Sequence, residues 1–458
     1  MNLHRMMSAR AEEGRPIRVG LIGAGKFGSM FMSQARRTPG LHLLAVADLD
    51  VPAAQRALAA TGWPEEQTRA PSFAAALESR GTFVTDDGHA LIASDGMEVV
   101  IDATGSPAAG IRHVLDCCRY GRHIIMVNVE ADALAGPLLA RRAAEAGIVY
   151  SLAYGDQPAL ICEQVDWARA AGFDVVAAGK GTLYMPDFHS STPETVWDHY
   201  GLDANRARVS GLNAKMFNSF LDGTKSAIEM AAVANATGLT PAPDGLAFPP
   251  CAADDLARTL IPKADGGCLE HKGQVEVVSS RDRQGCDLDG DLRWGVYVTF
   301  EAPSDYVERC FADYGLITDA SGRYTALWRP YHMIGLELGI SVAYVGLMGQ
   351  ATGCATGFRA DAVATAKRDL AAGEVLDGEG GATVWGRLMP AADSVQQGAL
   401  PIGLAHGMAL KNDVVEGATV CWCDVEADDG GEAVRFRREM EKSTRLMAPG
   451  AAGTAWTW

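Results

Sequence analysis

The first third of the chain alternates short apolar runs with stretches of helical periodicity. The runs lie at residues 17–22, 41–50, 97–107 and 122–130, and apolar residues at helical spacing fill the intervals between them. Mainly apolar runs of this length are typical of strands that are buried on both faces of a parallel sheet. Strands that alternate with helices predict βαβ units, and the longer interval 64–95 predicts extra helices.

Beyond residue 159 the pattern becomes mixed. It predicts a strand and loop over 173–186, one long helix over 213–239, a strand within 290–303 and a buried helix over 333–349. After Asp361, short apolar segments and many glycines predict a small β-rich module. The sequence therefore predicts an α/β protein in three parts. These are a Rossmann domain (15–158), an α+β catalytic and dimerisation domain (159–355) and a β-rich C-terminal domain (356–445).

Three glycines follow the first apolar run. The stretch RVGLIGAGKFGSM (18–30) places Gly23, Gly25 and Gly28 between the predicted strand and the next helix, and Asp48 ends the following run. This G-x-G-x-x-G spacing, in this context, is the fingerprint of a dinucleotide-binding fold. There the first glycine allows a tight turn, the second lets the pyrophosphate approach the backbone, and the third lets helix and strand pack closely. The alternative is a turn of the same shape that no longer binds a cofactor.

Asp48 bears on the choice of cofactor. A carboxylate at this position accepts a hydrogen bond from the 2′-hydroxyl of NAD and repels the 2′-phosphate of NADP. Arg36 and Arg37 are cations that could tolerate that phosphate, as could Lys26, so NAD and NADP both stay open. Residues after the later strands are expected beside the cofactor, or they form ordinary strand-to-helix turns. The other expected cofactor contacts are Gly23, Gly25, Lys26, Phe27, Gly28, Thr104, Gly105, Ser106 and Asn128.

Three segments of the middle region carry candidate substrate chemistry. They are AAGKGTLYMPDFHSSTPETVW (177–197), the predicted helix 213–239, and WRPYHMIGLELG (328–339). Lysines, hydroxyls and amides suit an anionic substrate, and a histidine beside a carboxylate suits proton transfer. The alternatives are a helix N-cap, a solvated helix face and a histidine that only packs. The catalytic candidates are Lys180, Lys225, His332 and Glu337, and the substrate-binding candidates are Ser191, Thr192, Lys215 and Asn218.

The composition limits the classes of partner that the protein can be expected to bind. The formal net charge is −17 and no basic block occurs, which argues against nucleic acid or an anionic membrane surface as a partner. A small anionic or polyol molecule is the expected partner. The ten cysteines form no C-x-x-C pair and no signal peptide is evident, so we expect reduced thiols in a cytoplasmic protein. The polar ends, 1–15 and 448–458, are expected to be loose.

The order of motifs resembles a known family. After the glycine fingerprint come GDQPA (155–159), the segment 177–197, MFNSFLDGTKSAIEMA (216–231) and RPYHMIGLELG (329–339). Over residues 16–445 this order resembles the 1-deoxy-D-xylulose 5-phosphate reductoisomerase-like proteins, a bacterial family related to homoserine dehydrogenase. The C-terminal part, with ATAKRDLAAGEVL and GLAHGMALKNDVVEGATV, is similar to an SAF module.

The resemblance implies an activity. It implies NADPH-dependent isomerisation and reduction of a phosphorylated ketose to 2-C-methyl-D-erythritol 4-phosphate, a step of isoprenoid biosynthesis, in a homo-oligomer. A divalent cation, Mg²⁺ or Mn²⁺, would hold the vicinal oxygens of the substrate, and its ligands stay unassigned. The roles implied are phosphate and oxyanion binding for Lys180, Ser191, Thr192, Lys215, Asn218 and Lys225, and proton transfer for His332 and Glu337.

Two other functions stay open. One is a dehydrogenase of another polyol, a hydroxy acid or a homoserine-like substrate, although Asn128 lacks the following lysine of homoserine dehydrogenases. The other is a cofactor-sensing protein without turnover. An enzyme needs Lys180, Lys225 and His332 close to the nicotinamide, whereas a sensor does not.

Overall fold

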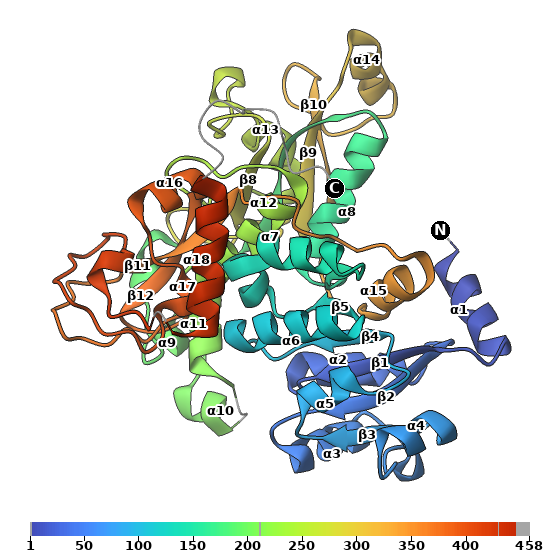
Figure 1. Cartoon of the computed structure of the whole chain (residues 1–458). Coiled ribbons are helices and arrows are strands. Elements are labelled where there is room, and N and C mark those ends of the chain that lie inside the picture. The colour runs from blue at the N-terminus through green and yellow to red at the C-terminus, as the bar shows by residue number, and fades with distance from the viewer. Residues whose placement is uncertain (1, 210–211, 429, 446–458) are drawn as a thin grey trace. The chain divides into compact units, whose positions relative to one another are not determined.

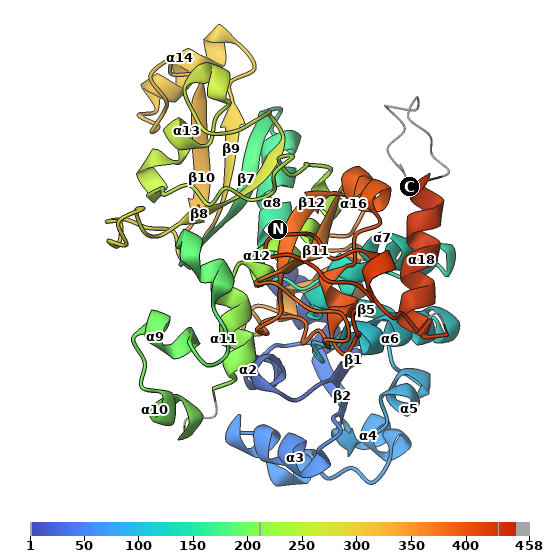
Figure 2. The same cartoon turned by 90° about the vertical axis from the view of Figure 1, so that its left-hand side faces the viewer.

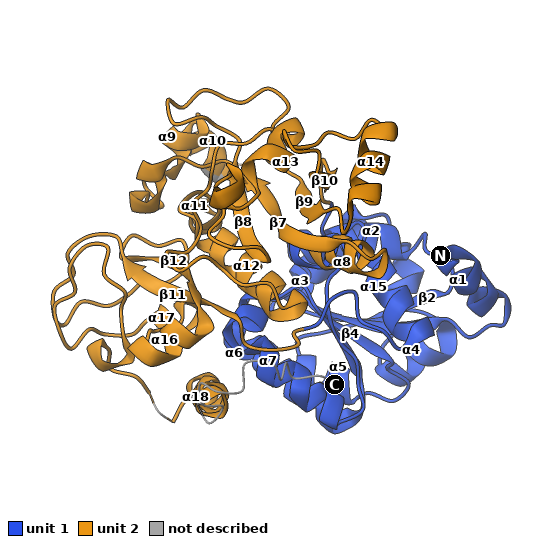
Figure 3. Cartoon of the chain, turned by 90° about the horizontal axis from the view of Figure 1, so that it is seen from above, with its two compact units in different colours: residues 1–160, 333–354 blue, residues 161–332, 355–458 orange. Residues whose placement is uncertain are grey.

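The chain divides into two compact units (Figure 3). The computed structural model describes residues 2–209, 212–428 and 430–445, and the predicted loose end 448–458 lies outside them. No helix in these ranges is long and apolar enough to span a bilayer. Unit 1 comprises Met1–Leu160 and Met333–Cys354, and unit 2 comprises Ile161–His332 and Ala355–Trp458.

Unit 1 is built on a six-stranded parallel sheet in the order β3-β2-β1-β4-β5-β6 (Figure 1). This is the strand order of a Rossmann fold, so the predicted fold class is confirmed. The order reverses between β1 and β4, and ligands of such sheets bind beyond the carboxyl ends of the strands at that point. The strands are β1 (Ile17–Ile22), β2 (Leu41–Ala47), β3 (Phe83–Thr85), β4 (Val99–Asp102), β5 (His123–Met126) and β6 (Tyr150–Leu152).

Helices connect these strands. The interval 64–95 holds the extra helices that its length predicts, together with the short strand β3, which the sequence pattern did not reveal. The helices of unit 1 are α1 (Leu3–Glu12), α2 (Lys26–Ala35), α3 (Val51–Ala60), η1 (Glu65–Gln67), α4 (Phe73–Ser79), α5 (Gly88–Ala93), α6 (Pro107–Tyr120), α7 (Val129–Glu145), α15 (Gly339–Ala343) and the π-helix η5 (Tyr344–Met348).

The N-terminal stretch corrects one expectation. Residues 1–15 were expected to be loose, but α1 covers most of them and contacts α15 and η5. Met7 is buried in the core of unit 1, and Leu3 packs against the same core. Two apolar residues four positions apart lie on one helix face, and their burial stabilises a helix that is otherwise polar.

The apolar segment 333–349 joins the same core. Its helical part consists of α15 and η5, so the predicted buried helix is shorter than expected. Leu338, Val342 and Val345 are buried against the strands of the Rossmann sheet. The structure therefore groups this segment with unit 1, although it follows the middle region in sequence. The division into three domains stays a prediction.

Unit 2 contains a four-stranded sheet in the order β10-β9-β7-β8 and a separate antiparallel pair, β11-β12. The helix α12 (Thr224–Thr237) contacts both, and the cartoon shows β11 and β12 beside it (Figure 2). It is buried on nearly all sides, which explains its mostly small and apolar residues. The strands are β7 (Asp174–Thr182), β8 (Gln274–Ser279), β9 (Val296–Glu301), β10 (Tyr324–Arg329), β11 (Ala360–Ala366) and β12 (Val384–Pro390).

The single helix predicted over 213–239 is wrong, because two helices, α11 (Ala214–Leu221) and α12 (Thr224–Thr237), replace it. Gly223 lies between them with a φ of +91°, a conformation that glycine adopts without steric cost. The Thr224 N–H donates to Asp222 Oδ1 at 2.9 Å, which satisfies one of the free N–H groups at the start of α12. The Asp-Gly pair was the signal for this break.

The C-terminal part is less purely β than expected. Its longest helix, α18 (Glu432–Arg445), is held by Arg437, which is fully buried and forms ion pairs with Asp361 and Glu441. The remaining helices of unit 2 are α8 (Gln157–Ala170, which begins in unit 1), η2 (Pro186–Ser190), α9 (Val196–Tyr200), α10 (Ala204–Val209), η3 (Ala253–Asp255), α13 (Leu256–Thr259), η4 (Lys263–Asp265), α14 (Asp305–Asp313), α16 (Ala391–Gln397), α17 (Ile402–Ala405) and η6 (Trp422–Asp424).

One buried carboxylate links the stability of unit 1 to pH. Asp132 of α7 is fully buried, and this burial raises its pKa to about 7. The Tyr150 hydroxyl donates to Asp132 Oδ1 at 2.7 Å, whereas Oδ2 has no hydrogen-bond partner among the described residues. The folded chain therefore holds this proton more tightly than the unfolded chain does. Stability is lost as the pH rises from about 4 to about 7.

We predict that Asp132→Asn removes the loss of stability that accompanies the rise in pH. The amide cannot ionise, so between pH 5 and pH 8 the variant should gain on the order of 2–3 kcal/mol in stability over the parent protein. Thermal unfolding at both pH values measures the effect, and Asp95→Asn, at an exposed site, is the control. An unchanged Tm difference between the two pH values in Asp132→Asn would contradict the prediction.

Candidate functional site

The glycine turn after β1 has the shape that a pyrophosphate requires. Gly23 has a φ of +100°, and a Cβ there would lie 2.6 Å from the Ala103 carbonyl oxygen. A Cβ on Gly28 would lie 2.2 Å from the Gly23 carbonyl oxygen, so α2 packs closely only because position 28 is glycine. At Gly25 no described atom lies within 4 Å of an added Cβ, and the backbone faces open space. These are the three environments that the fingerprint predicts.

Asp48, which follows β2, is hydrogen-bonded to the backbone of this turn. Its Oδ2 accepts from the Ala24 N–H at 2.7 Å, and its Oδ1 accepts from the Asp50 N–H at 2.9 Å. Each carboxylate oxygen can accept more than one hydrogen bond, so Asp48 can hold the turn and still accept from a ribose hydroxyl.

The turns after β4 and β5 share a buried polar network. Asp102 Oδ1 accepts from the Thr104 hydroxyl at 2.7 Å, and Asp102 Oδ2 lies 3.0 Å from His113 Nδ1. Asn128 caps the start of α7 and donates from Nδ2 to the Ser106 carbonyl at 2.8 Å. Thr104, Ser106 and Asn128 thus fix the two turns at the reversal of strand order. Sequence reasoning missed Asp102 and His113, although an acid at the end of an apolar strand was a usable signal.

These features fit a dinucleotide. Lys26 and Phe27 begin α2, and no described side chain caps its N-terminus, so its first N–H groups and its dipole can face phosphates. Gly105 has a φ of +65° and no described atom within 4 Å of an added Cβ. A nicotinamide cofactor held here would supply hydride transfer to or from a substrate carbon.

In unit 2, Lys180 forms a buried ion pair. Lys180 lies near the end of β7, and its Nζ contacts Glu229 Oε2 of α12. Both side chains are buried, so each charge depends on the other for compensation. Glu229 lies within the segment predicted as the helix 213–239, and the structure gives it this specific partner.

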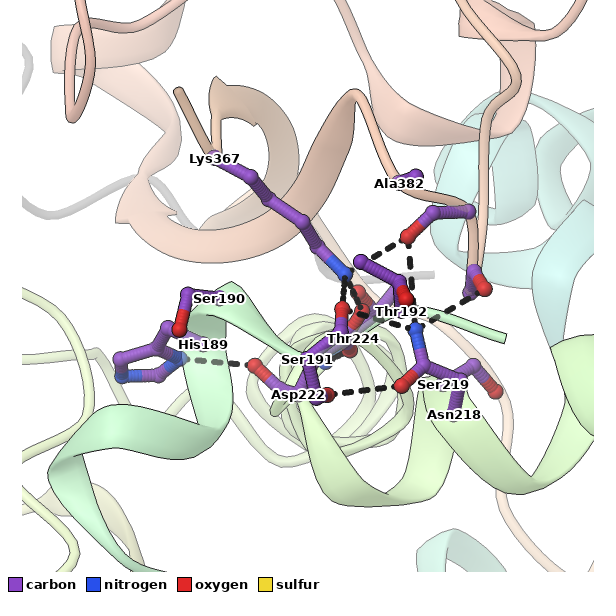
Figure 4. A network of polar contacts seen from close by, with 12 residues as sticks. His189, Ser190, Ser191, Thr192, Asn218, Ser219, Asp222, Thr224, Lys367 and Ala382 are labelled. Atoms are coloured by element: carbon purple, nitrogen blue, oxygen red, sulfur yellow. Dashed lines mark hydrogen bonds and ion pairs between the residues drawn. The ribbon is translucent and has the colours of Figure 1, made fainter. Parts of the chain in front are cut away.

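Ser191 and Asn218 meet in a second buried network (Figure 4). The Ser191 hydroxyl donates to Asn218 Oδ1 at 2.7 Å, and Asn218 Nδ2 donates to the Gly380 carbonyl at 3.0 Å. Lys367 joins them, because its Nζ donates to the Ser191 carbonyl at 2.6 Å and to Asp222 Oδ2 at 2.8 Å. Sequence reasoning missed Lys367, which is 176 residues from Ser191 and has no local signal.

His189 forms one side of this network. Its Nδ1 lies 2.7 Å from the Asp222 carbonyl, and its Nε2 lies 3.0 Å from the Tyr184 hydroxyl. Burial lowers its pKa, which favours a neutral ring that donates from Nδ1 and accepts at Nε2. The ring stacks on Trp385 of β12, with centroids 3.8 Å apart.

The remaining candidates have other hydrogen-bond partners. Lys215 Nζ donates to the Asp377 carbonyl at 2.7 Å, and Thr192 Oγ1 accepts from the Glu194 N–H at 3.3 Å. His332 Nδ1 lies 2.8 Å from the Trp294 carbonyl in unit 2, whereas Glu337 accepts from the Met333 N–H within unit 1. Lys225 lies in the first turn of α12. The structure thus joins Ser191, Asn218 and Lys215 to the 377–381 loop and pairs Lys180 with Glu229.

The cysteines and the possible metal ligands of the described chain contribute little to these sites. All ten cysteines are free thiols, and burial raises the pKa of those at Cys251 and Cys268 to about 11 and about 12. Within residues 2–209, 212–428 and 430–445, no three His, Cys, Asp or Glu side chains gather as a metal site would require.

Part of the chain matches a known family of catalytic domains. Residues 155–338 match a family described as "Oxidoreductase DRL, catalytic domain". The match places the chain among the oxidoreductases. It covers β7, the Lys180–Glu229 pair and the His189–Asn218 segment, but neither the glycine turn nor Lys367. No curated protein matches the chain.

Solved structures share only part of the chain. An NAD-binding oxidoreductase from Klebsiella pneumoniae is 20% identical, covers 37% of this chain and 43% of its own, and has a TM-score of 0.27. An Agrobacterium radiobacter oxidoreductase in complex with NAD⁺, L-tartaric acid and magnesium is 16% identical, with 36% and 44% covered and a TM-score of 0.27. Lactobacillus casei scyllo-inositol dehydrogenase is 14% identical, with 37% and 46% covered and a TM-score of 0.25. The chain thus spans less than half the length of each, and this likeness assigns no substrate.

The contrast between Gly25 and Gly28 gives a prediction. Gly25→Ala should weaken NADH binding about tenfold or more, because the new methyl group occupies the space that the pyrophosphate needs, while Tm stays unchanged. Gly28→Ala should instead lower stability by about 1–3 kcal/mol through overpacking. NADH fluorescence titration and thermal unfolding separate the two effects. Unweakened binding in Gly25→Ala would show that the cofactor does not lie on this turn.

Proposed function

We propose that the chain is an NAD(P)-dependent oxidoreductase whose cofactor binds at the glycine turn and whose reaction uses residues of the 155–338 segment. The observation that supports the proposal is that one chain contains both a complete Rossmann fingerprint and a segment that matches an oxidoreductase catalytic domain. In its finer form the substrate is 1-deoxy-D-xylulose 5-phosphate, as the order of motifs implies.

A dehydrogenase of a polyol or hydroxy acid is the second candidate. Ser191, Lys215 and Asn218, for which the resemblance implies phosphate and oxyanion binding, hydrogen-bond within unit 2. This use of their polar atoms favours a substrate without a phosphate.

We assign proton transfer to Lys180. Its ammonium group can donate to a substrate oxygen when a carbonyl is reduced, and Glu229 stabilises that ammonium in the resting protein. Because both partners are buried together, the pair excludes water from the lysine until substrate binds. His189, held neutral by burial, positions the loop that follows β7.

The test follows absorbance of the reduced nicotinamide band with NADH and NADPH in parallel. The substrates are 1-deoxy-D-xylulose 5-phosphate with Mg²⁺ or Mn²⁺, with and without fosmidomycin, and then a panel of polyols and hydroxy acids. Inhibitable oxidation with the ketose phosphate would establish the finer proposal. Turnover only with the panel would establish the second candidate, and cofactor binding without any turnover would leave a sensing protein.

With the substrate so found, Lys180→Met should lower kcat by about 10²-fold or more and leave the Kd for NADH unchanged. Removal of one partner of a buried pair destabilises by about 3–5 kcal/mol, so Lys180→Met/Glu229→Met, which removes both charges, is measured beside it. Lys263→Met, at an exposed lysine that pairs with Glu270, is the matched control. Full activity in the double variant would exclude Lys180 as the proton donor.

We propose NAD as the preferred cofactor. Asp48 and Asp50 follow β2, and Asp87 lies beside them, because the Asp48 N–H and the Asp87 N–H both donate to Thr85. Asp48 and Asp87 are carboxylates near the expected ribose position that repel a 2′-phosphate, whereas Asp50 pairs with Arg56 at 3.9 Å. Arg36 lies against Gly62 beyond the far end of α3, about 15 Å along that helix from Asp50, so it does not offset them.

Asp48→Ser should therefore move the preference towards NADP. We expect the ratio of Kd values for NADPH and NADH to fall about tenfold or more, because one repelling charge and one ribose acceptor are removed. Paired titrations of both cofactors measure the ratio, with Asp95→Asn as the charge-matched control. A ratio that stays at its original value would place the adenosine ribose away from Asp48.

A further inference from the structure

We propose that unit 2 holds a second ligand site, which binds a small oxyanion such as a phosphoryl or carboxylate group. The site is a cavity of about 230 Å³ within unit 2, large enough for one small molecule. It does not depend on the function proposed above. Its walls come from six separate segments and include His189, Phe248, Thr365, Trp385 and Arg387.

Two aromatic stacks make the walls rigid. His189 stacks on Trp385 at 3.8 Å between centroids, and Tyr184 stacks on Phe248 at 4.0 Å. The Tyr184 hydroxyl and the Asp222 carbonyl hold the two nitrogens of His189. Because these rings are fixed by their neighbours, the cavity is already formed before a ligand binds.

Phe248 adds a strained backbone to this wall. It has a φ of +50°, which is uncommon for a bulky residue. Its N–H and that of Ala247 donate to Glu276 Oε1 at 3.3 and 3.1 Å, and these bonds hold the strained turn in place. Such conformations persist only where the surroundings enforce them, and they cluster at binding sites.

Thr365 supplies an unused hydrogen-bonding group. Its side chain is 2% exposed, and its Oγ1 has no hydrogen-bond partner among the described residues. Thr365 pairs with Trp385 across the β11–β12 ladder, so both side chains lie on the same face, which is the face that lines the cavity. A buried hydroxyl without a partner is costly, and a ligand oxygen in the cavity would satisfy it.

Arg387 supplies the charge. One of its N–H groups donates to the Asp244 carbonyl at 3.1 Å, which fixes the guanidinium at the wall. Arginine presents five N–H donors in a planar fork that suits carboxylate and phosphoryl groups. Arg387 is the cation among the residues that line the cavity, whereas the N–H groups of Lys367 are used by Ser191, Asp222 and Gly381.

Two carboxylates also face the cavity region. Asp222 is fully buried, but Lys367 Nζ lies 2.8 Å from its Oδ2 and compensates its charge. Asp244 is exposed at the rim, where water screens it. A third carboxylate, Glu276, contacts the wall at Phe248 and accepts hydrogen bonds from backbone N–H groups. Among the described residues, half-buried Arg387 bonds to a carbonyl and to no carboxylate, so it is the cation of the wall that can bind an anion.

Titration of the full chain with inorganic phosphate, and separately with acetate, tests the site by calorimetry and by Tm. We expect saturable binding of at least one of them to the parent protein and to Arg258→Met, a control at an exposed arginine of the same unit. Arg387→Met should weaken that binding about tenfold or more, and Arg387→Lys less. Thr365→Val, which removes only the unpartnered hydroxyl, should weaken it roughly threefold to tenfold and should fold normally.

The outcomes are distinct. If the occupant is the phosphoryl group of the substrate, phosphate competes with it and Arg387→Met raises KM for the substrate but not for the cofactor. If the occupant is a free oxyanion, phosphate or acetate binds without competition. Absence of saturable binding with both probes and no KM effect would overturn the proposal, as would binding that is equal in the parent, Arg387→Met and Thr365→Val. All of these readouts are separate from NADH binding at unit 1, so they also separate this site from the proposed function.

Discussion

A single buried ammonium group ties unit 2 together. Lys367 Nζ donates to Asp222 Oδ2, to the Ser191 carbonyl and to the Gly381 carbonyl at 2.6–2.8 Å, so all three of its N–H groups are used. A buried charge is tolerated only when it is paired and its hydrogen bonds are complete, and this lysine meets both conditions. It comes from the C-terminal part of the chain, and its acceptors at 191 and 222 come from the middle part. This contact joins the two parts, together with the packing of α12 against β11 and β12.

Asp222 is the residue whose carboxylate pairs with Lys367, and it has several further contacts. Its carboxylate accepts from Lys367 and from the Thr224 N–H, and its carbonyl lies 2.7 Å from His189 Nδ1. One residue therefore ends α11, starts α12, anchors the C-terminal part and fixes the His189 ring. The proposed oxyanion cavity depends on it, because His189 holds Trp385 in the wall. A ligand site here can be rigid because a buried network sets its geometry.

The sequence predicted unit 1 well because its determinants are local. The glycine spacing, the first two apolar runs and the acid at Asp48 all lie within residues 17–50, and each has one physical meaning in a βαβ unit. Unit 2 could not be predicted in the same way. Asn218 and Lys215 have the residue types of a substrate site, but their partners lie 162 residues away, and only the fold brings these together. Lys367 and Thr365 lacked any local signal, whereas the break at Gly223 had one in its Asp-Gly pair.

Five of the buried carboxylates in this chain divide into two groups, and the division follows their partners. Glu229, Asp222 and Asp361 each face a buried cation, so their charges are compensated inside the protein. Asp132 has a tyrosine hydroxyl, and Glu276 has the N–H groups of Ala247, Phe248 and Val277; burial raises the pKa of both to about 7. Hydrogen bonds from neutral groups thus offset only part of the desolvation of a carboxylate, whereas a cation offsets most of it. Because Glu276 holds the strained turn at Phe248, protonation of Glu276 below about pH 7 would weaken those bonds. Oxyanion binding at the cavity should then fall in the same pH range in which unit 1 becomes more stable.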